Sequence, residues 1–139
     1  MEFAPGSPAI LLDALHNPAG AEALAYSLDV LFPGVVFVFV MAVLIDRDIA
    51  GILTPLMPSA SAFIFTRPSS SRVPPHSPND LVDFARARGK RSRAVESPSK
   101  ALEAARELAG PEEIACVCGS LSLVGEIWAE LHPEDRGDL

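Results

Sequence analysis

The feature that most constrains the fold is a regular alternation of short apolar runs with segments of helical spacing. The runs are rich in valine, isoleucine and phenylalanine, the composition of strands that are covered on both faces. They occupy residues 9–12, 35–45, 62–65 and 114–117, and a weaker run covers residues 92–95. We therefore expect each run to form a strand of one buried sheet.

Helical segments separate these runs. We expect helices over residues 18–31, 48–57 and 121–131, and two more that begin at residues 78 and 98. In each of the last two, a serine precedes a proline at the first helical position, so Ser77 and Ser97 are predicted N-caps. Pro55 lacks an amide donor and should kink or end its helix early.

Strand and helix alternate about five times, which calls for parallel pairing, right-handed crossovers and helices on both faces of one sheet. The expected fold class is therefore α/β, a three-layer αβα sandwich. Its sheet should be mostly parallel, Rossmann-like, and built from five to six strands. A length of 139 residues fits one domain, so we expect a single domain over residues 1–139.

Charge and hydropathy exclude several classes of function. A net charge of −7 disfavours a general nucleic-acid or anionic-membrane surface, because both need a broad positive field. The longest apolar run, residues 35–45, is far shorter than the ~20 residues of a membrane-spanning helix. No secretory signal is visible at the amino terminus, so we expect a cytoplasmic protein. Basic residues cluster at the end of the third helix and in the loop after it, where cations stay solvated: Arg86, Arg88, Lys90, Arg91 and Arg93.

The two cysteines, Cys116 and Cys118, alternate within an apolar run. Residues two apart on a strand point to the same face and lack the geometry of an ordinary disulfide. A metal site would need more ligands than Cys-x-Cys supplies. We therefore expect buried, reduced thiols and no metal site.

Polar residues follow four of the expected strands, and in parallel sheets such residues meet at the carboxyl edge, where ligands bind. They are Asp13, His16 and Asn17 after the first run, Asp46, Arg47 and Asp48 after the second, Thr66 and Arg67 after the third, and Gly119 and Ser120 after the last. Helix amino termini at that edge favour a phosphate or carboxylate, even in an acidic protein. The pattern predicts an anion-binding site.

Structural roles are open alternatives for the same residues. Asn17 and Ser120 can be helix caps, and Asp13 can bind nearby amides or orient His16. The acidic residues beside Arg47 are also common at a helix start. The Ser- and Pro-rich loop at residues 67–78 suits either a flap over a site or a plain linker. We assign no role to His76 or His132.

Three stretches resemble a known family. ILLDALHNPAGA at residues 10–21 resembles the LLDGAHNPxGA loop of folylpolyglutamate and dihydrofolate synthases, which are members of the Mur ligase superfamily. Residues 40–49 are similar to that family's segment ending in Asp-Lys-Asp-Ile, and CGSLSLVGE at residues 118–126 is similar to its TGSLYLVGE. The chain departs from the pattern at Ala14-Leu15, where the family has Gly-Ala, and at Arg47, where it has lysine.

The resemblance implies the carboxy-terminal domain of an ATP-dependent ligase that makes an acyl phosphate on a folate and then an amide with glutamate. Carried over by position, Asp13 and His16 would face the nucleotide phosphates and the acyl phosphate, with Asn17 beside them. Arg47 and Ser120 would bind the incoming glutamate. The implied partners are an amino-terminal ATPase domain, glutamate and a folate-type substrate, with ATP and magnesium used by the complete enzyme.

A Gly-rich phosphate loop ending in Gly-Lys-Thr or Gly-Lys-Ser does not occur in these 139 residues. We therefore expect the ATPase domain to be absent from this chain and the chain alone to be inactive. The alternative is a stand-alone, non-catalytic ligand-binding or regulatory module that retains the fold.

Overall fold

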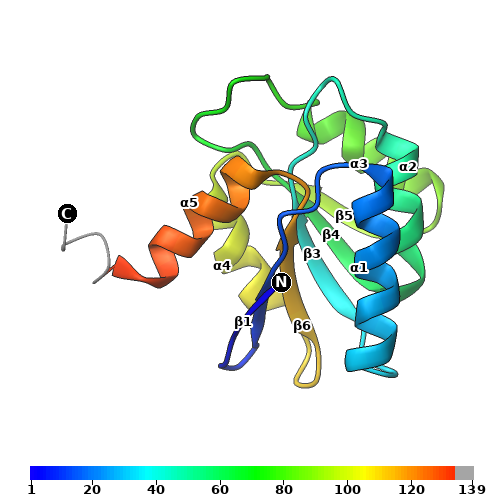
Figure 1. The fold of residues 1–139 in the computed structure, drawn as a ribbon, viewed down its shortest axis with the longest axis vertical. Coiled ribbons are helices and arrows are strands. Elements are labelled where there is room, and N and C mark those ends of the chain that lie inside the picture. Colours follow the sequence, from blue (N-terminus) through cyan, green and yellow to red (C-terminus); the bar gives the residue numbers. More distant parts are fainter. Residues whose placement is uncertain (134–139) are drawn as a thin grey trace.

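A computed structural model describes residues 1–133, which form a six-stranded sheet covered by helices on both faces (Figure 1). The strands are β1 (Glu2–Ala4), β2 (Ile10–Leu12), β3 (Phe37–Met41), β4 (Ala60–Phe65), β5 (Arg91–Ala94) and β6 (Ile114–Cys118). The helices are α1 (Pro18–Leu31), α2 (Ile49–Leu53), the 3₁₀ helix η1 (Thr54–Ser59), α3 (Pro78–Ala87), α4 (Pro98–Leu108) and α5 (Leu121–Leu131).

The strands lie in the order β1-β2-β6-β3-β4-β5. All neighbours pair in parallel except β1, which runs antiparallel to β2 along one edge. The last strand, β6, is inserted between β2 and β3, so strands from the first and last parts of the chain are neighbours in the sheet. The predicted α/β class and mostly parallel sheet are confirmed. The edge strand β1 was not among the predicted strands, because it has only three residues, two of them exposed, and contains no apolar run.

Side chains that alternate along the central strands build two separate cores. Along β3, Phe37, Phe39 and Met41 face the layer of α1, α2, η1 and α3. Val38 and Val40 face the layer of α4 and α5. On the first face, phenylalanine rings of β3 and β4 form a continuous row, with centroids of neighbouring rings 5.4 to 5.9 Å apart. The predicted three-layer sandwich follows from this two-sided burial.

Element boundaries follow the local chemistry. The helices predicted over residues 18–31 and 121–131 have those bounds. The apolar run at 35–45 forms a strand only over Phe37–Met41. Pro55 ends the regular α2 early, and the chain continues as η1. Ser97 caps α4 by accepting a bond from the Lys100 amide at 3.2 Å, whereas the Ser77 side chain makes no capping bond to α3.

Cys116 and Cys118 are buried, unbridged and on one face of the sheet, as predicted; that face is the one covered by α1. Burial raises the pKa of the Cys118 thiol well above its ordinary value, and the neighbouring Cys116 adds to the rise. The Cys118 side chain is therefore a neutral part of the core at physiological pH.

Two residues of the basic cluster bind backbone oxygens of the neighbouring strands β5 and β4. Arg86 donates to the carbonyl of Ser92 at 2.9 Å, and Lys90 donates to the carbonyl of Ala60 at 3.0 Å. Across residues 1–133, no helix combines the length and apolar character that crossing a bilayer requires.

Gly119 is the residue on which the close approach of β6 and β3 depends. Its φ is +101°, and a β-carbon added there would collide with the backbone oxygen of Ala42. Gly125 in α5 is a matched control, because a β-carbon there would meet open space.

We predict that Gly119→Ala lowers the free energy of unfolding by about 2–4 kcal/mol, through backbone strain and steric overlap. Gly125→Ala should instead raise it by roughly 0.5–1 kcal/mol, because alanine favours a helix interior. Urea denaturation of the two variants measures both effects. Equal stability of Gly119→Ala and the parent chain would contradict the close contact.

Candidate functional site at the carboxyl edge of the sheet

The residues that follow the parallel strands form one continuous rim. Backbone bonds extend the strand pairing past the strand ends, because the Asp13 amide donates to the Val117 carbonyl at 3.0 Å. In the same way, the Thr66 amide donates to the Met41 carbonyl at 2.9 Å. The rim therefore carries the residues that follow β2, β6, β3 and β4, side by side.

The loop after β2 holds Asp13, His16 and Asn17. The Asp13 carboxylate accepts a bond from the Leu15 amide at 3.0 Å. The His16 ring is exposed, and its Nδ1 lies 3.2 Å from the Ala14 carbonyl. A carbonyl only accepts, so this bond requires the proton on Nδ1 and leaves Nε2 free. Asp13 therefore binds a nearby amide, and the Ala14 carbonyl orients the imidazole.

Asn17 and Ser120 cap two helices that begin at the rim. The Asn17 side chain accepts a bond from the Gly20 amide at 2.7 Å at the start of α1. The buried Ser120 hydroxyl accepts a longer bond of 3.4 Å from the Leu123 amide at the start of α5. The helix-capping role that was one alternative for each residue is therefore confirmed at both. Both helix amino termini also give this edge partial positive charge.

Arg47 lies in the loop that joins β3 to α2. Its Nε is buried and has no hydrogen-bond partner within the part of the chain that the structure describes. The nearest carboxylate contact is Asp46, whose Oδ1 is 3.7 Å from Nε and whose side chain is half exposed. Such a pair contributes little. Asp48 begins α2 without a side-chain capping bond. The weak pair with Asp46 and the 38% exposure of the Arg47 side chain leave its guanidinium accessible to an anion.

Two further residues lie at this edge. Thr66, predicted at the rim but without a role of its own, is fully buried, and its hydroxyl has no partner within residues 1–133. His76, which was assigned no role, reaches back from the 67–78 loop to the carbonyl of Arg47 at 3.0 Å. The sequence could not predict this contact, because the partner of His76 is a backbone atom and no side-chain pattern marks it.

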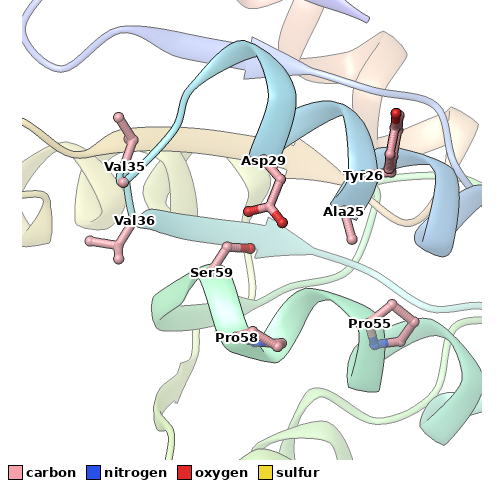
Figure 2. Close-up of a pocket in the computed structure, with 9 residues that line it drawn as sticks. Ala25, Tyr26, Asp29, Val35, Val36, Pro55, Pro58 and Ser59 are labelled. Carbon is pink, nitrogen blue, oxygen red and sulfur yellow. The ribbon is translucent and has the colours of Figure 1, made fainter.

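Two hollows in the surface lie at the opposite, amino-terminal edge of the sheet. One of about 320 Å³ opens between α1 and η1, where Asp29 points toward Ser59 (Figure 2). A second, of about 470 Å³, shares residues 34–36 with it. Neither of these two hollows is lined by any predicted site residue.

Magnesium and nucleotide fit this rim only in part. Within residues 1–133, no three histidine, cysteine, aspartate or glutamate side chains gather as a metal cage. Asp13 is the rim carboxylate nearest in sequence to His16, whose ring is exposed. These residues suit contact with a phosphate group, and a metal would need further ligands from outside this chain.

Comparison with known proteins shows which family the chain matches. The family model for the Mur ligase glutamate ligase domain matches residues 1–121. A dihydrofolate synthase/folylpolyglutamate synthase of Mycobacterium tuberculosis is 39% identical over 85 residues, which are 61% of this chain and 16% of that relative.

Solved structures agree with this match. A folylpolyglutamate synthase of Mycobacterium tuberculosis, complexed with ADP and AMPPCP, is 30% identical, with a TM-score of 0.82 over 94% of this chain and 31% of that one. A bifunctional folylpolyglutamate synthase/dihydrofolate synthase with Mn, AMPPNP and L-glutamate bound is 26% identical, with a TM-score of 0.79. That match covers 94% of this chain and 30% of the bifunctional enzyme. The chain therefore spans less than a third of the length of these proteins.

We predict that Ser120→Ala lowers the free energy of unfolding by about 1 kcal/mol, because the start of α5 loses its cap. Ser122→Ala, at the exposed second residue of the same helix, is the control and should change stability by less than about 0.5 kcal/mol. Thermal unfolding of both variants measures the difference. Equal effects would show that the Ser120 hydroxyl does not cap α5.

Proposed function

The chain belongs to the glutamate ligase domain family of the Mur ligases, and we propose that it supplies the glutamate-binding half of an ATP-dependent ligase that adds glutamate to a folate or dihydropteroate acceptor. Its resemblance to the carboxy-terminal domain of folylpolyglutamate synthases is confirmed by the family match and the mycobacterial relatives. The activity, the substrates and the roles of single residues are the proposal.

The observation that carries this proposal is the Nε of Arg47, which is buried without a hydrogen-bond partner within residues 1–133, while the side chain as a whole is 38% exposed and so accessible to a ligand. The Asp46 carboxylate, 3.7 Å away, is too distant for a hydrogen bond, so a ligand oxygen at hydrogen-bond distance would satisfy this donor better. A carboxylate of glutamate satisfies a guanidinium with two parallel bonds, a geometry that the family's lysine does not offer. Ser120, at the neighbouring strand end, is the second proposed contact to the amino acid.

Asp13, His16 and Asn17 form the proposed phosphate side of the rim. The free Nε2 of His16 is exposed and positioned to donate a bond to a phosphoryl oxygen when the ring is protonated. The amino terminus of α1 adds partial positive charge at the same place. ATP and magnesium supply the phosphoryl group and its charge neutralisation, and their principal ligands lie outside this chain.

In the proposed reaction, the neutral amine of glutamate attacks the acyl carbon of the acyl phosphate. The C–N bond of the amide forms, the C–O bond to phosphate breaks, inorganic phosphate leaves, and the nitrogen loses a proton to the departing phosphate or to water. Arg47 fixes the glutamate, and His16 stabilises the charge on the departing phosphate. Holding both reactants in place makes the bimolecular step effectively unimolecular, and charge stabilisation lowers its barrier further. A site along this rim suits this division, because the second half of the site belongs to an ATPase domain.

Mixing the chain with a separate ATPase domain tests this proposal. The chain alone should not hydrolyse ATP, since its sequence contains no phosphate loop. Adding a phosphate-loop ATPase domain, taken from the mycobacterial relative, should produce ADP release that depends on both L-glutamate and a folate acceptor. Failure of glutamate to stimulate ADP release, combined with ligand binding by the chain alone, would instead support a stand-alone binding module.

We predict that His16→Ala in the reconstituted ligase lowers turnover by roughly one to three orders of magnitude, because the transferring phosphoryl charge loses a donor. Stability should not change, since the His16 ring is exposed. His132→Ala is the control, because that ring stacks on Trp128, away from the rim. Unchanged turnover in His16→Ala would remove His16 from the active site.

A further inference from the structure

A segment of the chain crosses the carboxyl edge and is fixed at both ends. We call residues 67–77 the clamp, which is the long green loop at the top of Figure 1. Near its start, the backbone amide and hydroxyl of Ser69 donate to the two carboxylate oxygens of Glu126 in α5, at 2.8 and 2.6 Å. The clamp therefore begins on the helix that Ser120 caps.

The far end of the clamp pairs with the loop after β3. The Ile45 amide donates to the Pro74 carbonyl at 2.8 Å, and the His76 amide donates to the Val43 carbonyl at 2.7 Å. These bonds flank an isolated antiparallel bridge between Leu44 and Pro75. The start of the loop that carries Arg47 is thus hydrogen-bonded to the clamp in an antiparallel arrangement.

His76 completes this attachment at Arg47 itself. Its Nε2 lies 3.0 Å from the Arg47 carbonyl, and the ring is half-buried. Because a carbonyl only accepts, Nε2 must carry a proton in this contact. The Arg47 amide is also bound, to the Leu44 carbonyl at 2.9 Å. Both backbone groups of Arg47 are therefore fixed, while its buried Nε has no partner within residues 1–133.

We infer that His76 is a positioning residue for Arg47, and that the clamp sets the position of this guanidinium relative to the start of α5. The inference rests on the proposed function in one respect only, namely that Arg47 binds the glutamate carboxylate. A side chain bound to ligand must be held in place before the ligand arrives, because ordering it later weakens binding. Loss of the His76 contact should therefore weaken glutamate binding and leave the chemistry intact.

The chain alone provides the first test. We predict that His76→Asn, whose amide is too short to reach the Arg47 carbonyl, accelerates hydrogen exchange at the Ile45 amide at least about tenfold. His76→Gln, whose terminal amide replaces Nε2, should restore slow exchange. His132→Asn is the matched control and should have no effect at Ile45. Equal exchange in the parent, His76→Asn and His76→Gln would overturn the clamp.

The reconstituted ligase provides the second test. There, His76→Asn should raise the KM for L-glutamate about tenfold, change kcat by less than about twofold, and leave the KM for ATP unchanged. His76→Gln should return the glutamate KM to near the parent value. A loss confined to kcat, or no rescue by glutamine, would overturn the positioning role. If His76→Asn fails to fold, Glu126→Ala releases the other end of the clamp, and an unchanged glutamate KM would overturn the inference.

The two proposals can fail separately. If Arg47→Ala leaves the glutamate KM unchanged in the reconstituted ligase, Arg47 does not bind glutamate and the proposed role fails. The exchange measurement at Ile45 still decides whether His76 holds the loop. If exchange responds to His76→Asn and Arg47→Ala raises the glutamate KM while His76→Asn does not, the proposed function stands and the positioning inference fails.

Discussion

The parallel pairing of β6 between β2 and β3 is the constraint on which the rest of the structure depends. It aligns Leu12 with Val117 and Met41 with Cys118, so three loops that are distant in the chain leave the sheet at one edge. The approach is close enough that Gly119 has no room for a side chain beside Ala42. A rim of this kind is a property of the pairing order, and no single loop can produce it.

The proposed anion-binding role concerns one edge of the sheet only. The net charge of −7 is a property of the whole molecule, whereas helix amino termini and Arg47 act locally at the rim. Buried thiols and phenylalanine rings pack against the sheet on the side of α1. The two hollows described above lie at the opposite edge and contain none of the proposed site residues.

Much of this arrangement was predictable from the sequence, because it rests on side-chain patterns. Periodicity gave the bounds of α1 and α5, apolar runs marked five of the six strands, and the DALHNP loop pointed to the family. Three features were not predictable, because no side-chain pattern marks them. The edge strand β1 has no apolar pattern, and Ser77 precedes a helix that its side chain does not cap. The contact of His76 with the Arg47 carbonyl depends on the path of a long loop.

Hydrogen–deuterium exchange of the reconstituted ligase, with and without nucleotide and L-glutamate, tests the central claim most directly, because it reports on both edges of the sheet at once. The account predicts that ligands slow exchange in residues 13–17, 43–47 and 119–123, and leave residues 25–36 and 110–113 unchanged. Protection confined to the second group would place the ligand edge at the opposite end of the strands and contradict the account.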